Sequence, residues 1–144
     1  MFLEQIRAID TNKRELGEDE VRRNDPIVLA YIGDSLYDLY VRCRLIYTGD
    51  FKAGDLHKKS IKYVCAYGQA KALDIVESRL DEDENGIVRR AKNAKANPPK
   101  NCDKSTYLKA TAFEALAGYL YLTSNIERLE ELFKLVFDEV SLSS

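Results

Sequence analysis

Residues 27–41, with the sequence IVLAYIGDSLYDLYV, decide the fold class of this chain. The segment is apolar nearly all round, which is typical of a helix in the middle of a fold. Residues 24–26 (NDP) offer a capping side chain and then a proline at a first-turn position, so we predict a helix over residues 27–45. Residues 110–122, ATAFEALAGYLYL, repeat this pattern and predict a second buried helix, which begins near Tyr107.

The rest of the chain has a helical pattern too. A periodicity of 3.6 residues recurs from one end to the other, without any long strand-like alternation. We therefore predict an all-α fold of five main helices. The polar residues 1–23 are interpreted as a loosely held N-terminal arm with a short helix near residues 2–9, and residues 24–144 as one domain. The other three main helices are expected over residues 54–80 (bent near Gly68), 81–94 and 126–140.

Composition excludes several classes of protein. The net charge of −2 gives no global signature of a nucleic-acid binder. No stretch approaches the run of about 20 apolar residues that a membrane span needs. The N-terminus carries an acidic residue, Glu4, where a signal peptide has only basic ones, so we expect a cytoplasmic protein. Three widely separated cysteines and a single histidine, His57, argue against a zinc site and a Ser-His-Asp triad. Any metal would therefore need oxygen ligands.

Two acids interrupt the two apolar helices, Asp34 in the first and Glu114 in the second. An ionised carboxylate is costly to bury without compensation, so each demands an explanation. Small residues would let the helices approach until the acids face each other, and magnesium or manganese would then relieve their repulsion. They are Ala30 and Gly33 beside Asp34, and Ala115, Ala117 and Gly118 beside Glu114. The alternative is that each acid pairs with an arginine, a lysine or a tyrosine hydroxyl. Asp38, one turn after Asp34, is a secondary candidate ligand that a solvated helix position explains more simply.

Positive charge is concentrated in one segment. Residues 89–109 contain seven lysines and arginines but a single acid, Asp103, and Asn97-Pro98-Pro99 breaks the segment in the middle. We predict a basic, exposed loop that draws phosphate toward the two acids. A loop that is merely solvated is the alternative interpretation.

These motifs resemble a known family. Residues 29–37, LAYIGDSLY, resemble the signature helix of ribonuclease III nuclease domains, and residues 111–122 resemble the second acidic helix of that family. Residues 89–95, then 99–101 and Tyr107, are similar to the short bacterial branch called Mini-ribonuclease III, which lacks the usual double-stranded-RNA-binding domain. The resemblance covers roughly residues 24–140. It implies a helical nuclease domain that forms a homodimer, with a valley for an RNA duplex.

The resemblance also implies an activity. Asp34 and Glu114 would be catalytic and would hold Mg²⁺, or Mn²⁺ in its place, in an endoribonuclease that leaves 5′-phosphate and 3′-hydroxyl ends. Duplex RNA would be recognised through shape, phosphates and 2′-hydroxyls. The expected substrate is precursor large-subunit (23S) ribosomal RNA, and a ribosomal protein is a candidate partner. The RNA-binding residues implied are Arg89, Arg90, Lys92, Asn93, Lys95, Lys100 and Asn101.

The chain departs from the family at two positions. Typical members carry a glutamate one turn before Asp34 and an aspartate three residues before Glu114, where this chain has Ala30 and Thr111. We therefore expect weak metal affinity in the absence of RNA phosphates. One competing hypothesis is a duplex-RNA-binding ribosome-assembly factor without catalysis, and another is a helical protein-interaction module. Cleavage separates the nuclease from the assembly factor, and the interaction module predicts no RNA affinity.

Overall fold

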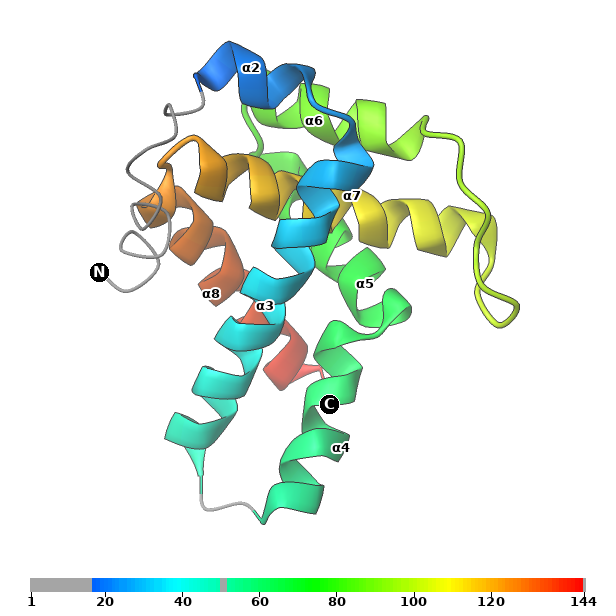
Figure 1. Ribbon diagram of the computed structural model, residues 1–144. Helices are drawn as coiled ribbons and strands as arrows, with labels where there is room; N and C mark the ends of the chain where they lie inside the picture. The colour runs from blue at the N-terminus through cyan, green and yellow to red at the C-terminus, as the bar shows by residue number, and fades with distance from the viewer. Residues whose placement is uncertain (1–16, 50–51, 144) are drawn as a thin grey trace, which may run out of the picture.

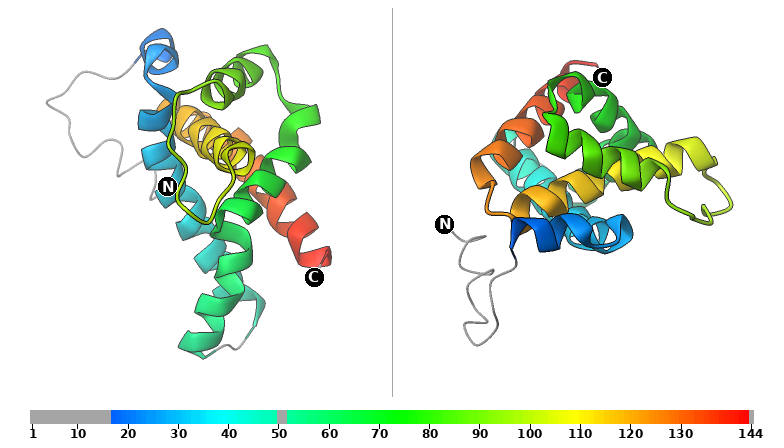
Figure 2. Two further views of the ribbon diagram at one scale, coloured as in Figure 1. Left: turned by 90° about the vertical axis from the view of Figure 1, so that its right-hand side faces the viewer. Right: turned by 90° about the horizontal axis from the view of Figure 1, so that it is seen from above.

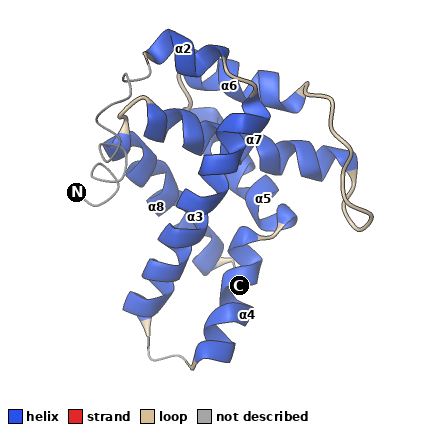
Figure 3. Cartoon of the chain, viewed as in Figure 1, coloured by secondary structure: helices blue, strands red, loops and turns tan. Residues whose placement is uncertain are grey.

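The computed structural model describes residues 17–49 and 52–143, and the regular structure in these ranges is entirely helical (Figures 1 and 3). The all-α prediction is therefore confirmed for the described part of the chain. In chain order the elements are α2 (Glu18–Arg23), α3 (Pro26–Thr48), α4 (Ala53–Val64), α5 (Ala66–Val76), the 3₁₀ helix η1 (Glu77–Arg79), α6 (Glu82–Lys92), α7 (Lys104–Leu122) and α8 (Ile126–Leu142).

The two apolar helices begin where their capping residues predict. The Asp25 carboxylate accepts a hydrogen bond from the Ile27 backbone N–H at 2.9 Å, and Pro26 takes the first helical position of α3. Proline fits there because the first N–H groups of a helix have no partner within it. In the same way Asp103 caps α7 by accepting from the Thr106 N–H at 2.7 Å.

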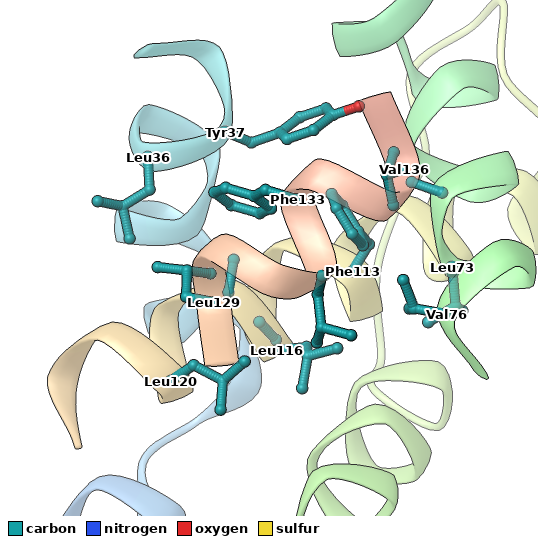
Figure 4. Close-up of a cluster of buried hydrophobic side chains, with 14 of the residues drawn as sticks. Leu36, Tyr37, Leu73, Val76, Phe113, Leu116, Leu120, Leu129, Phe133 and Val136 are labelled. Carbon is teal, nitrogen blue, oxygen red and sulfur yellow. The ribbon is translucent and has the colours of Figure 1, made fainter. Parts of the chain in front are cut away.

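Helix α7 runs through the middle of the molecule, with α3, α5 and α6 packed around it and α8 closing one side (Figures 1 and 2). Its side chains are buried almost all round, with Glu114 the exception in its central turns. Figure 4 shows the aromatic core, in which the Tyr37 ring of α3 meets Phe113 of α7 edge-on, 4.9 Å between centroids, and Phe133 of α8 at 5.2 Å. This packing holds the backbone around Glu114 rigidly.

Helices α3 and α7 approach closely at two glycines. A Cβ atom at Gly33 would lie closer than 3.0 Å to the backbone carbonyl of Glu114, and one at Gly118 would meet the carbonyl of Leu29 in the same way. Any larger residue would push the helices apart, because the obstacle in each case is backbone. The close approach predicted from the small residues is therefore confirmed.

The helix predicted over residues 54–80 is in fact broken. The chain turns at Cys65, whose backbone is extended, and η1 follows α5. The Cys65 thiol caps α5 by accepting from the Gly68 N–H at 3.3 Å. Gly68 does not bend a continuous helix; it lets α5 pack against the last turn of α4, where a Cβ would collide with the Lys62 carbonyl. Beyond this corner, α4 and the end of α3 extend together away from the other helices (Figure 1).

Residues 18–23, expected in the loosely held arm, form α2. Val21 is fully buried, and the Tyr119 hydroxyl of α7 donates a hydrogen bond to Glu18 at 3.2 Å. The folded unit therefore extends to α2, and the short helix expected near residues 2–9 lies outside the described residues. None of the helices that the structure describes has the length and apolar character of a membrane span.

Candidate active site

Asp34 and Glu114 meet where α3 crosses α7. The tight contact between Gly33 and the Glu114 carbonyl sets the two helices against each other one residue before Asp34. The Glu114 carboxyl group is hydrogen-bonded to the side chain of Asp34. The two acids singled out in the sequence, 80 positions apart, therefore form one site.

The two acids differ in exposure. Glu114 is partly buried, as expected for an acid on an apolar helix, but Asp34 is exposed to solvent, so the expectation of a buried Asp34 is wrong. Asp34 lies next to the side of α3 that includes Val28 and Tyr31, and no element in the described ranges covers that side. The carboxyl pair is thus accessible from the Asp34 side and enclosed on the Glu114 side.

The environment of Glu114 changes its protonation. Burial raises its pKa to about 9, and the hydrogen bond and negative charge of Asp34 add to this effect, whereas a side-chain hydrogen bond with Gln69 opposes it. At neutral pH, without a cation, Glu114 therefore carries a proton that it donates to Asp34. Within the described chain, the groups acting on this pKa are Asp34 and Gln69, so the alternative in which arginine, lysine or tyrosine neutralises Glu114 is not observed.

The basic segment is divided between a helix and a loop. Arg89, Arg90 and Lys92 lie in the last turns of α6, and the connection from residue 93 to 103 stands out at the start of α7 (Figure 1). Two of these cations are used by the fold: Arg90 donates to the backbone carbonyls of Arg22 and, at 2.8 Å, Asn24, and Lys92 pairs with Glu77 at 2.6 Å. The helix predicted to about residue 94 is therefore confirmed as far as Lys92, and the prediction of an exposed loop is wrong for this first part of the segment.

The other predicted RNA-binding residues are open to solvent. Their side chains form no ion pair with any residue in the described ranges. They are Arg89 at the end of α6 and Asn93, Lys95, Lys100 and Asn101 in the connection that follows.

The Ribonuclease III domain model matches residues 27–125, a range that includes both acidic helices and the basic segment between them. The chain belongs to the ribonuclease III family. It is 44% identical to the Mini-ribonuclease 3 of Symbiobacterium thermophilum over 114 residues, which are 78% of this chain and 88% of that relative. It is also 44% identical to the Mini-ribonuclease 3 of Brevibacillus brevis over 126 residues, 87% of this chain and 93% of the relative.

A crystal structure of a protein from Fusobacterium nucleatum has the same fold. Its TM-score is 0.75 at 29% sequence identity, and the match covers 83% of this chain and 97% of that one. The chain is thus an endoribonuclease of the Mini-ribonuclease III branch. Enzymes of the ribonuclease III family act on double-stranded RNA and generally depend on a divalent metal.

The donor set of the site fits a hard divalent cation, because both side chains offer carboxylate oxygens. In the described ranges, no group of three or more Asp, Glu, His or Cys residues forms a metal cluster. Thr111, where typical ribonuclease III members have an aspartate, is buried and donates its hydroxyl to the Tyr107 carbonyl at 2.9 Å. Asp38 forms an ion pair with Arg42 on the next turn, 3.1 Å apart. Two carboxylates therefore carry the site.

Sequence reasoning missed Gln69, which lies on α5 beside Glu114. Gln69 is 4% exposed, and its Nε2 donates to the Val64 carbonyl at 3.0 Å. The available signal was an uncharged amide in the segment AYGQAKALDIV, whose other strongly polar side chains are the charged Lys71 and Asp74. That signal points to a site only once the break at Cys65 is known, because the break decides which face of α5 turns toward α7.

Proposed function

We propose that this ribonuclease III family member is a magnesium-dependent endoribonuclease in which Asp34 and Glu114 hold the cation, with Mn²⁺ as a substitute. The observation that carries the proposal is the carboxyl pair at the α3–α7 crossing, in which Glu114 is partly buried against Asp34 and Asp34 is exposed. When bound, Mg²⁺ supplies an acidified water and stabilises charge on the scissile phosphate. We infer products with 5′-phosphate and 3′-hydroxyl ends.

The two acids play different parts in this proposal. Asp34 is exposed and presents its oxygens on the side from which RNA approaches. Glu114 is held by the buried backbone of α7 and must release its proton before it can bind a cation. The Gly33 contact keeps the two carboxyl groups at a constant separation, since α3 and α7 cannot move apart or together at this point without disturbing the packed core.

Duplex RNA would be bound by exposed donors at the end of α6 and in the loop that follows. Arg89, Lys95 and Lys100 would contact phosphates, and Asn93 and Asn101 would donate to phosphate or ribose oxygens. Arg90 and Lys92 already have partners in the fold, so we assign them to holding α6 in place. These contacts would replace the RNA-binding domain that the Mini-ribonuclease III branch lacks.

A homodimer is the assembly we propose, with a second copy of the chain covering the exposed apolar stripe of α3. The stripe contains Val28, Tyr31, Leu39 and Ile46, which recur at the spacing of one helix side, and Tyr31 is 84% exposed. Apolar side chains in such a row favour burial against an identical row across a two-fold axis. The stripe flanks Asp34, so pairing along it would place two sites beside one shared RNA surface.

We infer that precursor 23S ribosomal RNA is the biological substrate, from the likeness to the Mini-ribonuclease III branch. A ribosomal protein is a candidate partner that would present this RNA, and the substrate would place the enzyme in the cytoplasm. The test is to incubate the purified protein and Mg²⁺ with a long RNA duplex and with a 23S precursor transcript, and to map the ends. Cuts in the paired ends of the precursor are expected. Cuts in the duplex alone would reject this substrate, and two intact RNAs would favour the assembly-factor hypothesis.

A further inference from the structure

Gln69 has an unusual set of partners for a buried side chain. Its Nε2 donates to the Val64 carbonyl, but its Oε1 is buried without a hydrogen-bond partner among the described residues. Leaving an amide oxygen unpaired inside a protein costs free energy, and a leucine or methionine would avoid that cost. The bond to the Val64 carbonyl accounts for one N–H of the amide, but the fold does not account for the second N–H or for the unpaired Oε1.

The corner between α4 and α5 explains where the amide points. Val64 is the last residue of α4, and the Gln69 backbone N–H bonds the Cys65 carbonyl at 2.9 Å in the first turn of α5. Gly68 lets this turn pack against the end of α4. The Gln69 side chain is thereby anchored at the corner, and its amide acts on the Glu114 carboxyl group of α7, whose pKa it lowers.

The orientation of the amide follows from its two acceptors. Nε2 carries two N–H groups, which suit the Val64 carbonyl and the Glu114 carboxyl oxygen. Turning the amide over would place Oε1 against two acceptors, so the unpaired Oε1 is the consequence of using both donors. A donor that is fixed in this way strengthens as Glu114 becomes ionised, because hydrogen bonds to a charged acceptor are stronger.

We propose that Gln69 is a positioning residue for Glu114: its amide, anchored on the Val64 carbonyl, holds the Glu114 carboxyl group turned toward Asp34 and ready to bind the cation. The proposal rests on the proposed function, in which Glu114 is a metal-binding carboxylate. The orientation of Glu114 matters because the site has few metal-binding side chains. With two carboxylates in place of four, a misoriented Glu114 would leave a single protein ligand.

The test compares Gln69→Met, which has similar length and no donor, with the control Ser60→Ala. Ser60 is also buried, and its hydroxyl bonds the His57 carbonyl at 2.7 Å within α4, without a partner in the site. Three quantities are measured on the full chain: kcat and KM for a long RNA duplex, Mn²⁺ affinity without RNA from the EPR signal of free Mn²⁺, and the unfolding temperature. For Gln69→Met we expect kcat and Mn²⁺ affinity to fall about 10-fold to 100-fold while KM stays within about twofold. Ser60→Ala should change only the unfolding temperature.

A Gln69→Met enzyme with the kcat and Mn²⁺ affinity of the wild type would overturn the proposal, as would equal losses in Ser60→Ala. If Gln69→Met does not fold, the shorter Gln69→Asn is measured against the same expectations. A double-mutant cycle with Glu114→Gln separates this proposal from the proposed function. Non-additive effects on the unfolding temperature of the metal-free protein are expected even if the enzyme cuts no RNA, and additive effects would contradict the Gln69–Glu114 contact.

Discussion

The α-carbon of Gly33 packs directly against the backbone carbonyl of Glu114. This contact joins the two acidic helices at the site itself, because Asp34 is the next residue on α3 and the Glu114 side chain begins at the same point of α7. The spacing of Asp34 and Glu114 therefore depends on the absence of a side chain at residue 33.

Gly33→Ala should separate α3 from α7. A methyl group there overlaps the Glu114 carbonyl, so we expect a loss of about 1–3 kcal/mol in the free energy of unfolding and at least a roughly tenfold loss of cleavage. Denaturant unfolding and a duplex-cleavage assay measure the two effects. Gly86→Ala is the matched control, because a Cβ atom added there on α6 would have no described atom within 4 Å. This variant should keep its activity and gain up to about 1 kcal/mol in the free energy of unfolding. Indistinguishable behaviour of the two variants would contradict the close contact.

The protonation of Glu114 predicts how stability depends on pH. Its pKa in the folded protein is about 9, above the ordinary value of 4.5, so its contribution to stability is complete below pH 4.5 and is lost as the pH rises through 9. Glu114→Gln has no such titration. Without metal, the unfolding temperature of the variant should therefore rise relative to that of the wild type as the pH increases from 4.5 to 9, by on the order of 5 °C. Mg²⁺ should restore the unfolding temperature of the wild type and leave that of Glu114→Gln unchanged. Parallel pH profiles of the two proteins without metal would contradict the raised pKa.

The partners of the basic residues predict two kinds of variant. Lys95→Ala and Lys100→Ala should each lower the slope of log affinity against log salt by roughly 1, because each removes one phosphate contact. Arg90→Ala should instead lower the unfolding temperature, since Arg90 holds the carbonyls of Arg22 and Asn24. Fluorescence anisotropy with a labelled duplex, in chelator to prevent cutting, gives the slopes. Unchanged slopes for both lysine variants would exclude the loop from the RNA surface.

The apolar stripe of α3 predicts the oligomeric state. Leu39→Glu places a charge in the proposed interface and should turn a dimer into a monomer at micromolar concentration, as measured by sedimentation equilibrium. Ile61→Glu is the control, because Ile61 is similarly exposed, at 45%, but lies on α4. A monomeric wild type, or a dimeric Leu39→Glu, would contradict the proposed assembly.

The parts of the fold that the sequence predicts are those set by local chemistry. Helices α3 and α7 follow from their apolar composition and from the caps Asp25 and Asp103, and their close approach follows from Gly33 and Gly118. The pairing of Asp34 with Glu114 could be anticipated for the same reason, since each is the acid at the centre of one of the two closely packed helices.

The features that escaped prediction depend on contacts between distant segments. Nothing near Cys65 marks a helix break, because cysteine is an uncommon cap and its neighbours are compatible with a helix. The sequence does not distinguish Arg90 from an exposed cation, because its partners, the carbonyls of residues 22 and 24, are distant along the chain. The exposure of Asp34 follows from the uncovered side of α3, which a pattern of apolar residues does not distinguish from a buried one.

Asp34 and Glu114 are proposed to form one metal-dependent cutting site. Cleavage of a long labelled RNA duplex by the wild type and by Asp34→Asn, with and without Mg²⁺, tests this directly. Asparagine keeps the shape of the side chain and removes its charge, so folding and RNA binding should be unaffected. We predict fragments on a denaturing gel from the wild type with Mg²⁺ and intact RNA in the other three reactions. Fragments from a folded Asp34→Asn, at the rate of the wild type, would show that Asp34 is not part of the cutting site.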